Sequence, residues 1–130
     1  MEQIGAKYFS KYDMSSQELA EEVGNIDLVY EAVGGSEVAF DVLQVLGTNG
    51  IFVFTGIPAP ETRLEIDSDI LMRRIVLENL AIVGTVNADR QAFEDAIADL
   101  AEFKKRWPET IKGVISGRFS VDDLEELLVG

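Results

Sequence analysis

The sequence contains neither cysteine nor histidine, and their absence excludes several kinds of chemistry. Thiolate nucleophiles, imidazole bases and the usual protein ligands of zinc, haem and iron–sulfur centres are missing from the chain. Any such chemistry in which the chain takes part needs groups from elsewhere. Basic residues are also scarce, because 11 Lys and Arg accompany 24 Asp and Glu, which gives a net charge of -13. That charge repels phosphate backbones and anionic lipid surfaces, so we expect neither nucleic acid nor membrane as a partner.

Long apolar runs and a secretory signal are missing too. No run approaches the roughly 20 residues that span a bilayer, and the start "MEQIGAKYFSKYD" lacks a basic region followed by an apolar core. We therefore expect a cytoplasmic protein. The 130 residues, 47% of them hydrophobic, suffice for one domain with a core. Salt screening would relieve the charge repulsion, so one hypothesis is a salt-adapted source, and an ordinary acidic cytosolic protein is the alternative.

Apolar runs alternate with amphipathic segments along most of the chain, a pattern typical of βαβ units. We expect an α/β fold with a partial Rossmann-like, mostly parallel sheet of about four strands and helices on both faces. The apolar side of the last long helix is expected to be core. The expected strands are 6–9, 26–35, 51–60 and 80–86, and the expected helices are 15–24, 36–47, 68–79 and 89–107, followed by a short strand after 113 and a helix capped by Ser120.

Three strand ends are candidate ligand contacts, because ligands bind outside the carboxyl ends of strands in an open parallel sheet. In "EAVGGS", Gly34 and Gly35 permit a tight turn, but the G-x-G-x-x-G fingerprint of dinucleotide sites is absent. In "FTGIPAP", Gly56 permits close backbone approach, although the pattern alone favours a plain Pro/Gly loop. In "GTVNAD", Asn87 carries donors and an acceptor for an amide or a sugar hydroxyl. Its commoner role at such a position is to cap a helix.

The order of four stretches carries a resemblance to a known family. The stretches are, in chain order, "LVYEAVG", "NGIFVFTGIP", "RRIVLENLAIVGTVNADRQAFEDAI" and "VISGRFSVDDLEELL", and the likeness that they carry covers nearly all 130 residues. In this order they resemble the C-terminal half of the medium-chain dehydrogenase/reductase family, and specifically its archaeal-type glucose dehydrogenases. Such enzymes transfer hydride from C1 of an aldose to NADP or NAD, with zinc as Lewis acid.

The resemblance implies roles for six residues at two strand ends. Thr55, Gly56 and Ile57 would contact the nicotinamide end of the cofactor, and so would Thr85, Val86 and Asn87. Asn87 would also bind the sugar substrate. The resemblance assigns no catalytic or metal-ligating residue to this chain, so the zinc of the parent enzyme would bind outside it.

The missing parts of that family shape the remaining expectations. The catalytic domain, the glycine fingerprint and the residue that selects NADP or NAD are all expected upstream of residue 1. We therefore expect residues 1–130 to be a single partial NAD(P)-binding domain that is inactive alone, with a tail, 108–130, that returns toward the catalytic domain. Residues 6–9 would lose their neighbouring strands, and we expect them to detach or, preferably, to pair with 26–35. Bare sheet edges favour a homo-oligomer.

Two other functions remain open. The chain is alternatively a non-catalytic α/β module for binding or oligomerisation, which the missing fingerprint favours. The chain is also compatible with part of an alcohol or polyol dehydrogenase of the same family. The asparagine of "GTVN" is the residue that favours a sugar dehydrogenase over these two.

Overall fold

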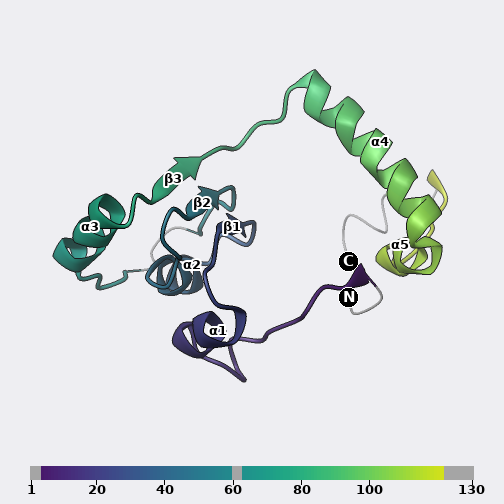
Figure 1. The fold of residues 1–130 in the computed structure, drawn as a ribbon. Helices are drawn as coiled ribbons and strands as arrows, with labels where there is room; N and C mark the ends of the chain where they lie inside the picture. The colour runs from purple at the N-terminus through teal and green to yellow at the C-terminus, as the bar shows by residue number, and fades with distance from the viewer. Residues whose placement is uncertain (1–3, 60–62, 122–130) are drawn as a thin grey trace. The chain divides into compact units, whose positions relative to one another are not determined.

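The computed structural model describes residues 4–59 and 63–121, in which eight helices and strands are found (Figure 1). They group into two compact units, residues 9–87 and residues 1–8 with 88–130, which are described separately. In chain order the elements are α1 (Ser16–Val23), β1 (Leu28–Glu31), α2 (Ser36–Leu43), β2 (Ile51–Phe54), α3 (Ser68–Leu77), β3 (Ala81–Gly84), α4 (Arg90–Arg106) and α5 (Pro108–Val114).

The unit formed by residues 9–87 is built on a parallel sheet with the strand order β1-β2-β3, which confirms the predicted α/β class (Figure 1). In register, Glu31 lies opposite Phe54, and Phe54 lies opposite Gly84. The described residues form three strands where about four were predicted. Residues 6–9 are not a strand, so the prediction of a strand there and its preferred pairing with β1 are wrong, while the alternative, detachment from the sheet, agrees with the structure. Without a hydrogen-bonded neighbouring strand, so short a segment gains too little free energy to compensate for the conformational entropy that it loses when it becomes extended.

The core of this unit lies on one face of the sheet. Phe52 of β2 is fully buried against Leu43 of α2, and Leu71 and Ile75 of α3 pack against the same cluster. Both helices share this face because two right-handed crossovers that run in the same direction place their helices on one side. Most side chains of the other face are exposed, as in Leu28 and Tyr30, at 62% and 66%, and Val53 of the central strand is half-buried. Within residues 9–87, the prediction of helices on both faces is therefore not met.

The helix ends of this unit follow from local capping. Ser15 and Glu18 form the predicted capping box of α1, with the Ser15 N–H donating to Glu18 Oε2 at 2.8 Å. In α3, the carboxylate of Asp67 accepts from the Ile70 N–H at 3.2 Å. α2 ends at Leu43 and is therefore shorter than the predicted helix, which extends to Gly47.

The other unit contains α4 and the unpredicted helix α5. Trp107 is the residue that connects the two helices. The centroid of its ring lies 5.7 Å from the centroid of the Phe103 ring. Pro108 ends α4, as expected, but it also starts α5, because a proline at the first helical position loses no hydrogen bond. The short strand expected after residue 113 is not formed in the described residues, and the predicted helix beyond Ser120 lies outside them.

The apolar side of α4 is exposed, which corrects its assignment to the core. Phe93, Ile97 and Leu100 keep 64%, 69% and 55% of their surface exposed. The periodicity predicts the helix correctly, but the described part of this unit has no sheet against which that side could pack. Among the described residues, no helix combines the length and the apolar character that crossing a membrane requires.

Candidate functional site

The segments after β2 and β3 leave the sheet side by side. Phe54 and Gly84 are register partners, and the Thr85 N–H donates to the Phe54 carbonyl oxygen at 3.0 Å. The residues that follow, Thr55–Ile57 and Thr85–Asn87, therefore start from neighbouring positions at the carboxyl edge of the sheet. This edge is where parallel sheets bind ligands.

These two segments present uncharged donors and acceptors to solvent. Ile57 is 77% exposed and Val86 is 68% exposed, and Asn87 is exposed as well. The backbone N–H and C=O groups of these three residues form no hydrogen bond with another described residue, nor does the carboxamide of Asn87. A planar amide or a hydroxyl is the kind of group that such donors and acceptors bind.

Thr55 and Gly56 are instead fixed to the end of β1. The carbonyl oxygen of Glu31 accepts hydrogen bonds from the Thr55 N–H at 2.9 Å, from Thr55 Oγ1 at 2.7 Å and from the Gly56 N–H at 3.1 Å. The hydroxyl oxygen of Thr55 can still accept a hydrogen bond, because a hydroxyl carries lone pairs besides its proton. Thr55 therefore anchors the segment and leaves Ile57 to face outward.

The carboxylate of Glu31 connects three backbone amides around the same strand end. Oε1 accepts from Val33 N–H at 2.8 Å and from Gly34 N–H at 2.6 Å, while Oε2 accepts from Gly56 N–H at 3.2 Å. The bond from Gly34 is the largest cause that lowers the pKa of Glu31. We call these four residues, Glu31, Val33, Gly34 and Gly56, the carboxylate bridge.

The carboxylate bridge needs glycine at two positions. A Cβ on Gly56 would lie 2.1 Å from the backbone nitrogen of Gly34, and a Cβ on Gly34 would lie 2.6 Å from the carbonyl oxygen of Ile57. Gly34 also has a φ of 76°, which residues with a side chain rarely adopt. The two loops approach each other closely because neither has a side chain at the contact.

Sequence reasoning missed Glu31. The signal was available in "LVYEAVGG", where a charged residue occupies the same face of an apolar strand as the partly buried Val29. A partly buried carboxylate requires hydrogen-bond donors, and the glycine pair that follows provides backbone N–H groups without steric obstruction.

The structure also tests the capping role of Asn87. The N-cap of α4 is Asp89, whose Oδ1 accepts from the Ala92 N–H at 2.8 Å. The capping role for Asn87 is therefore wrong, and its carboxamide is not needed to start the helix.

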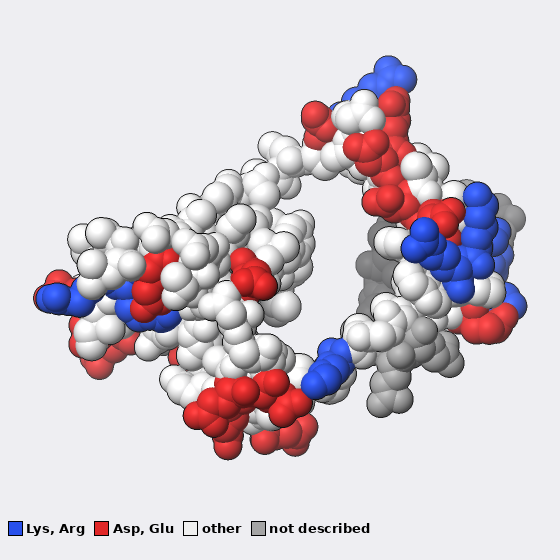
Figure 2. Space-filling view, viewed as in Figure 1, with Lys and Arg blue, Asp and Glu red and all other residues white. Residues whose placement is uncertain are grey.

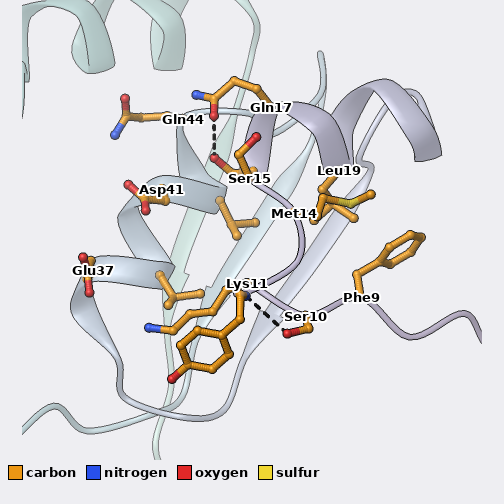
Figure 3. Close-up of a pocket in the computed structure, with 14 residues that line it drawn as sticks. Phe9, Ser10, Lys11, Met14, Ser15, Gln17, Leu19, Glu37, Asp41 and Gln44 are labelled. Atoms are coloured by element: carbon orange, nitrogen blue, oxygen red, sulfur yellow. Dashed lines mark hydrogen bonds between the residues drawn. The ribbon is translucent and has the colours of Figure 1, made fainter.

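A cavity of about 570 Å³ lies elsewhere in the same unit (Figure 3). It lies between the segment around Phe9 and Met14 and the side of α2 that carries Glu37 and Asp41, as the sticks in Figure 3 show. None of the six residues predicted to contact ligand lines it. The cavity and the ends of β2 and β3 are therefore two separate places on this unit.

The charges do not form a metal site in the described part of the chain. No group of three or more His, Cys, Asp or Glu residues there could hold a metal ion, so zinc does not fit this chain's described residues. Figure 2 shows acidic side chains over α1 and along α4, and basic ones at the end of α4, where Lys104, Lys105 and Arg106 complement the helix dipole.

Comparisons with known proteins identify relatives of the chain. A family profile described as "Glucose dehydrogenase C-terminus" matches residues 1–128. A glucose 1-dehydrogenase of Methanocella arvoryzae is 31% identical over 129 residues, which make up 99% of this chain and 36% of that protein. Glucose 1-dehydrogenase 1 of Haloterrigena turkmenica is 34% identical over 125 residues, or 96% of this chain and 33% of that protein.

Solved structures show the same fold. The crystal structure of glucose dehydrogenase from Haloferax mediterranei matches with a TM-score of 0.70 and 29% identity, over 78% of this chain and 28% of that chain. A structure of the Haloferax mediterranei enzyme in complex with NADP, Zn and gluconolactone matches with a TM-score of 0.71 and 24% identity, over 90% and 35% of the two chains. The chain thus spans about a third of the length of the relatives that it matches. By this match, which extends over nearly all of its residues, the chain belongs to the glucose dehydrogenase C-terminus family.

Proposed function

We propose that the chain forms the C-terminal part of the Rossmann-like cofactor domain of a zinc-dependent, NADP- or NAD-linked glucose 1-dehydrogenase. The observation that carries this proposal is the adjacency of Thr55–Ile57 and Thr85–Asn87 at one sheet edge, in a chain that belongs to this family. The two relatives named above are glucose 1-dehydrogenases, and the Haloferax mediterranei enzyme binds NADP, Zn and gluconolactone.

The residues at this edge fit the nicotinamide half of the cofactor. The backbone groups of Ile57 and Val86, which have no hydrogen-bond partner among the described residues, would hold the carboxamide, which is itself an uncharged donor and acceptor. When bound, the nicotinamide ring supplies the hydride acceptor. Asn87 would orient the sugar by a hydrogen bond to one of its hydroxyl groups. Zinc would be held outside this chain, because the sequence has neither histidine nor cysteine.

The proposal is tested by a titration of the ¹⁵N-labelled chain with reduced nicotinamide mononucleotide, followed by NMR. This probe contains the half of the cofactor that the proposed edge would contact. We expect amide shifts at Thr55–Ile57 and Thr85–Asn87, with no comparable shifts in the segment at the cavity around Met14. Shifts at the cavity alone, or none at all, would contradict the proposal.

Activity is the second test. We expect no reduction of NADP or NAD when the chain alone is mixed with glucose and zinc, because the described residues provide no zinc ligands. Turnover by the isolated chain would contradict the assignment of the catalytic groups to another part of the enzyme. Turnover with a simple alcohol or a polyol, in the complete enzyme, would favour a different substrate class within the family.

A non-catalytic oligomerisation module is the second candidate function. Its specific support is the exposed apolar face of the sheet, where Leu28 and Tyr30 lie on an edge strand. Sedimentation at increasing concentration tests it. Self-association without a response to the nicotinamide probe would favour the module, while a monomer at high concentration would count against it.

A further inference from the structure

We propose that Glu31 is a positioning residue for cofactor binding, which sets the place and direction of the segment Thr55–Ile57 through the carboxylate bridge. This inference rests on the proposed function, because it concerns the segment that would meet the nicotinamide. Glu31 itself is not expected to touch the ligand.

The carboxylate of Glu31 joins two loops. Oε1 is held by the turn after β1, at 2.6 Å from the Gly34 nitrogen, and Oε2 reaches the Gly56 nitrogen, at 3.2 Å, in the segment after β2. Gly34 and Gly56 are 22 positions apart, and their loops belong to different strands. The two oxygens therefore fix the distance between the loops in a way that a single backbone contact does not.

Within residues 4–59 and 63–121, few other contacts hold the segment after Gly56. Ile57 is 77% exposed, and Pro58 and Ala59 are exposed as well. The fully buried residues of this unit, Leu43, Leu46 and Phe52, lie within the core and before the strand end. Among the described residues, the direction in which Ile57 leaves the sheet therefore depends mainly on the bonds of Thr55 and Gly56 to the carbonyl oxygen of Glu31 and on the bond from Gly56 to its carboxylate.

A carboxylate suits these partners better than any other side chain. All three partners of the carboxyl group are N–H donors, and an ionised carboxylate offers only acceptors. A glutamine would present an NH₂ group to one of the loops. The hydrogen bond to that loop would be lost, because two N–H donors would then face each other. An aspartate keeps both oxygens but is one methylene shorter, so it cannot reach both loops at these distances.

The experiment compares Glu31→Gln with Glu37→Gln in the full chain. Glu37 is an exposed glutamate in the first turn of α2, so its substitution removes the same charge without touching the bridge. The amide resonances of Val33, Gly34 and Gly56 report the bridge directly. The affinity for reduced nicotinamide mononucleotide, measured by NMR titration, reports positioning.

We expect Glu31→Gln to shift the Gly34 and Gly56 amides and to weaken binding of the probe about tenfold, which is the scale of losing hydrogen bonds to a charged group. Resonances from the core around Phe52 should stay in place, and Glu37→Gln should bind like the original chain. Unchanged affinity in Glu31→Gln, with shifted glycine amides, would overturn the inference and leave the proposed function intact.

Two further outcomes are distinguishable from this one. If Glu31→Gln does not fold, Glu31→Asp takes its place, with a smaller loss of affinity expected and an unchanged affinity again overturning the inference. If the original chain itself gives no response to the probe, the proposed function fails, and the positioning role fails with it.

Discussion

Arg74 of α3 donates a hydrogen bond from Nη2 to the carbonyl oxygen of Leu46, 2.7 Å away, just beyond the end of α2. A second bond from Nη1 reaches the carbonyl oxygen of Gln44, the C-cap residue of α2. Glu78 orients the guanidinium, with 2.9 Å between Oε1 and Nε. Arg74 therefore joins two helices by satisfying carbonyl groups that the end of α2 leaves without helical partners.

The first prediction concerns this arginine. Arg74→Lys should lower the free energy of unfolding by about 1–2 kcal/mol, because an ammonium cannot keep the planar set of bonds to two carbonyls and a carboxylate. Arg73→Lys is the matched control, since Arg73 is its exposed neighbour in α3. Urea unfolding followed by circular dichroism measures both. Equal stability of the two variants would contradict the role of Arg74.

The second prediction concerns the close contact of two glycines. Gly56→Ala should destabilise this unit by several kcal/mol or displace the turn after β1, because its Cβ would lie 2.1 Å from the Gly34 nitrogen. Gly84→Ala at the end of the neighbouring strand is the control, because nothing lies within 4 Å of the added Cβ. We expect thermal unfolding to show a large loss only for Gly56→Ala. A similar loss for Gly84→Ala would show that strand-end glycines matter for another reason.

The sequence was sufficient to predict the parallel α/β pattern and most helices. Alternation of apolar strands with capped amphipathic helices depends on local chemistry, as in the capping box of Ser15 and Glu18 or the apolar run around Phe52. The adjacency of Thr55 and Thr85 followed from topology, because consecutive parallel strands end at the same edge.

Other features depend on contacts that local patterns do not contain. Residues 6–9 have the composition of a strand but no pairing partner among the described residues. Phe93 and Ile97 repeat at helical spacing, yet their burial requires a surface that the described part of their unit lacks. Glu31 was missed because its three partners come from two loops, one of them 25 positions along the chain.

The third prediction separates contact from capping at the end of β3. Asn87→Ala should weaken binding of reduced nicotinamide mononucleotide, or of glucose in the complete enzyme, without changing the helix content. Asp89→Ala should lower the helix stability by about 1 kcal/mol, because it removes the bond to the Ala92 N–H, and should leave binding of the probe unchanged. NMR titration and circular dichroism measure the two effects. Loss of helix content in Asn87→Ala would contradict the assignment of the cap to Asp89.

The fourth prediction is a pH dependence that comes from Glu31. The bond from the Gly34 N–H is the main cause that lowers the pKa of this carboxyl from its ordinary value of 4.5 in the unfolded chain. A group with a lowered folded-state pKa contributes stability that is complete above the unfolded value and is lost as the pH falls through the folded value. Stability should therefore fall below pH 4.5 in the original chain.

Glu31→Gln provides the comparison for this pH dependence, because an amide does not titrate. Between about pH 6 and about pH 3, its free energy of unfolding should decrease less than that of the original chain. Glu78, whose pKa is lowered by its hydrogen bond to Arg74, contributes in the same direction in both proteins. Parallel acid profiles of the two proteins, measured by urea unfolding, would show that the carboxylate of Glu31 does not stabilise the fold.

The fifth prediction concerns salt. With a net charge of -13, the folded chain repels itself, and raising KCl from about 0.1 M to about 2 M shortens the screening length from about 10 Å to a few Å. The exposed ion pairs that salt also weakens, such as Arg90 with Glu94, contribute little. Relief of repulsion should win, so the unfolding midpoint should rise by about 5 °C, equivalent to roughly 1 kcal/mol.

A non-ionic solute distinguishes the screening of charge repulsion from the general stabilisation that any solute excluded from the protein surface produces. Sucrose stabilises compact states by exclusion from the protein surface but leaves charge repulsion unchanged. At matched osmolality, KCl should raise the midpoint more than sucrose does, because acidic residues such as Glu21 and Glu22 lie next to each other on the exposed surface of α1. An equal midpoint at low and high KCl would refute salt adaptation and leave an ordinary acidic protein, in which the 24 acidic side chains are too widely spaced for their repulsion to limit stability.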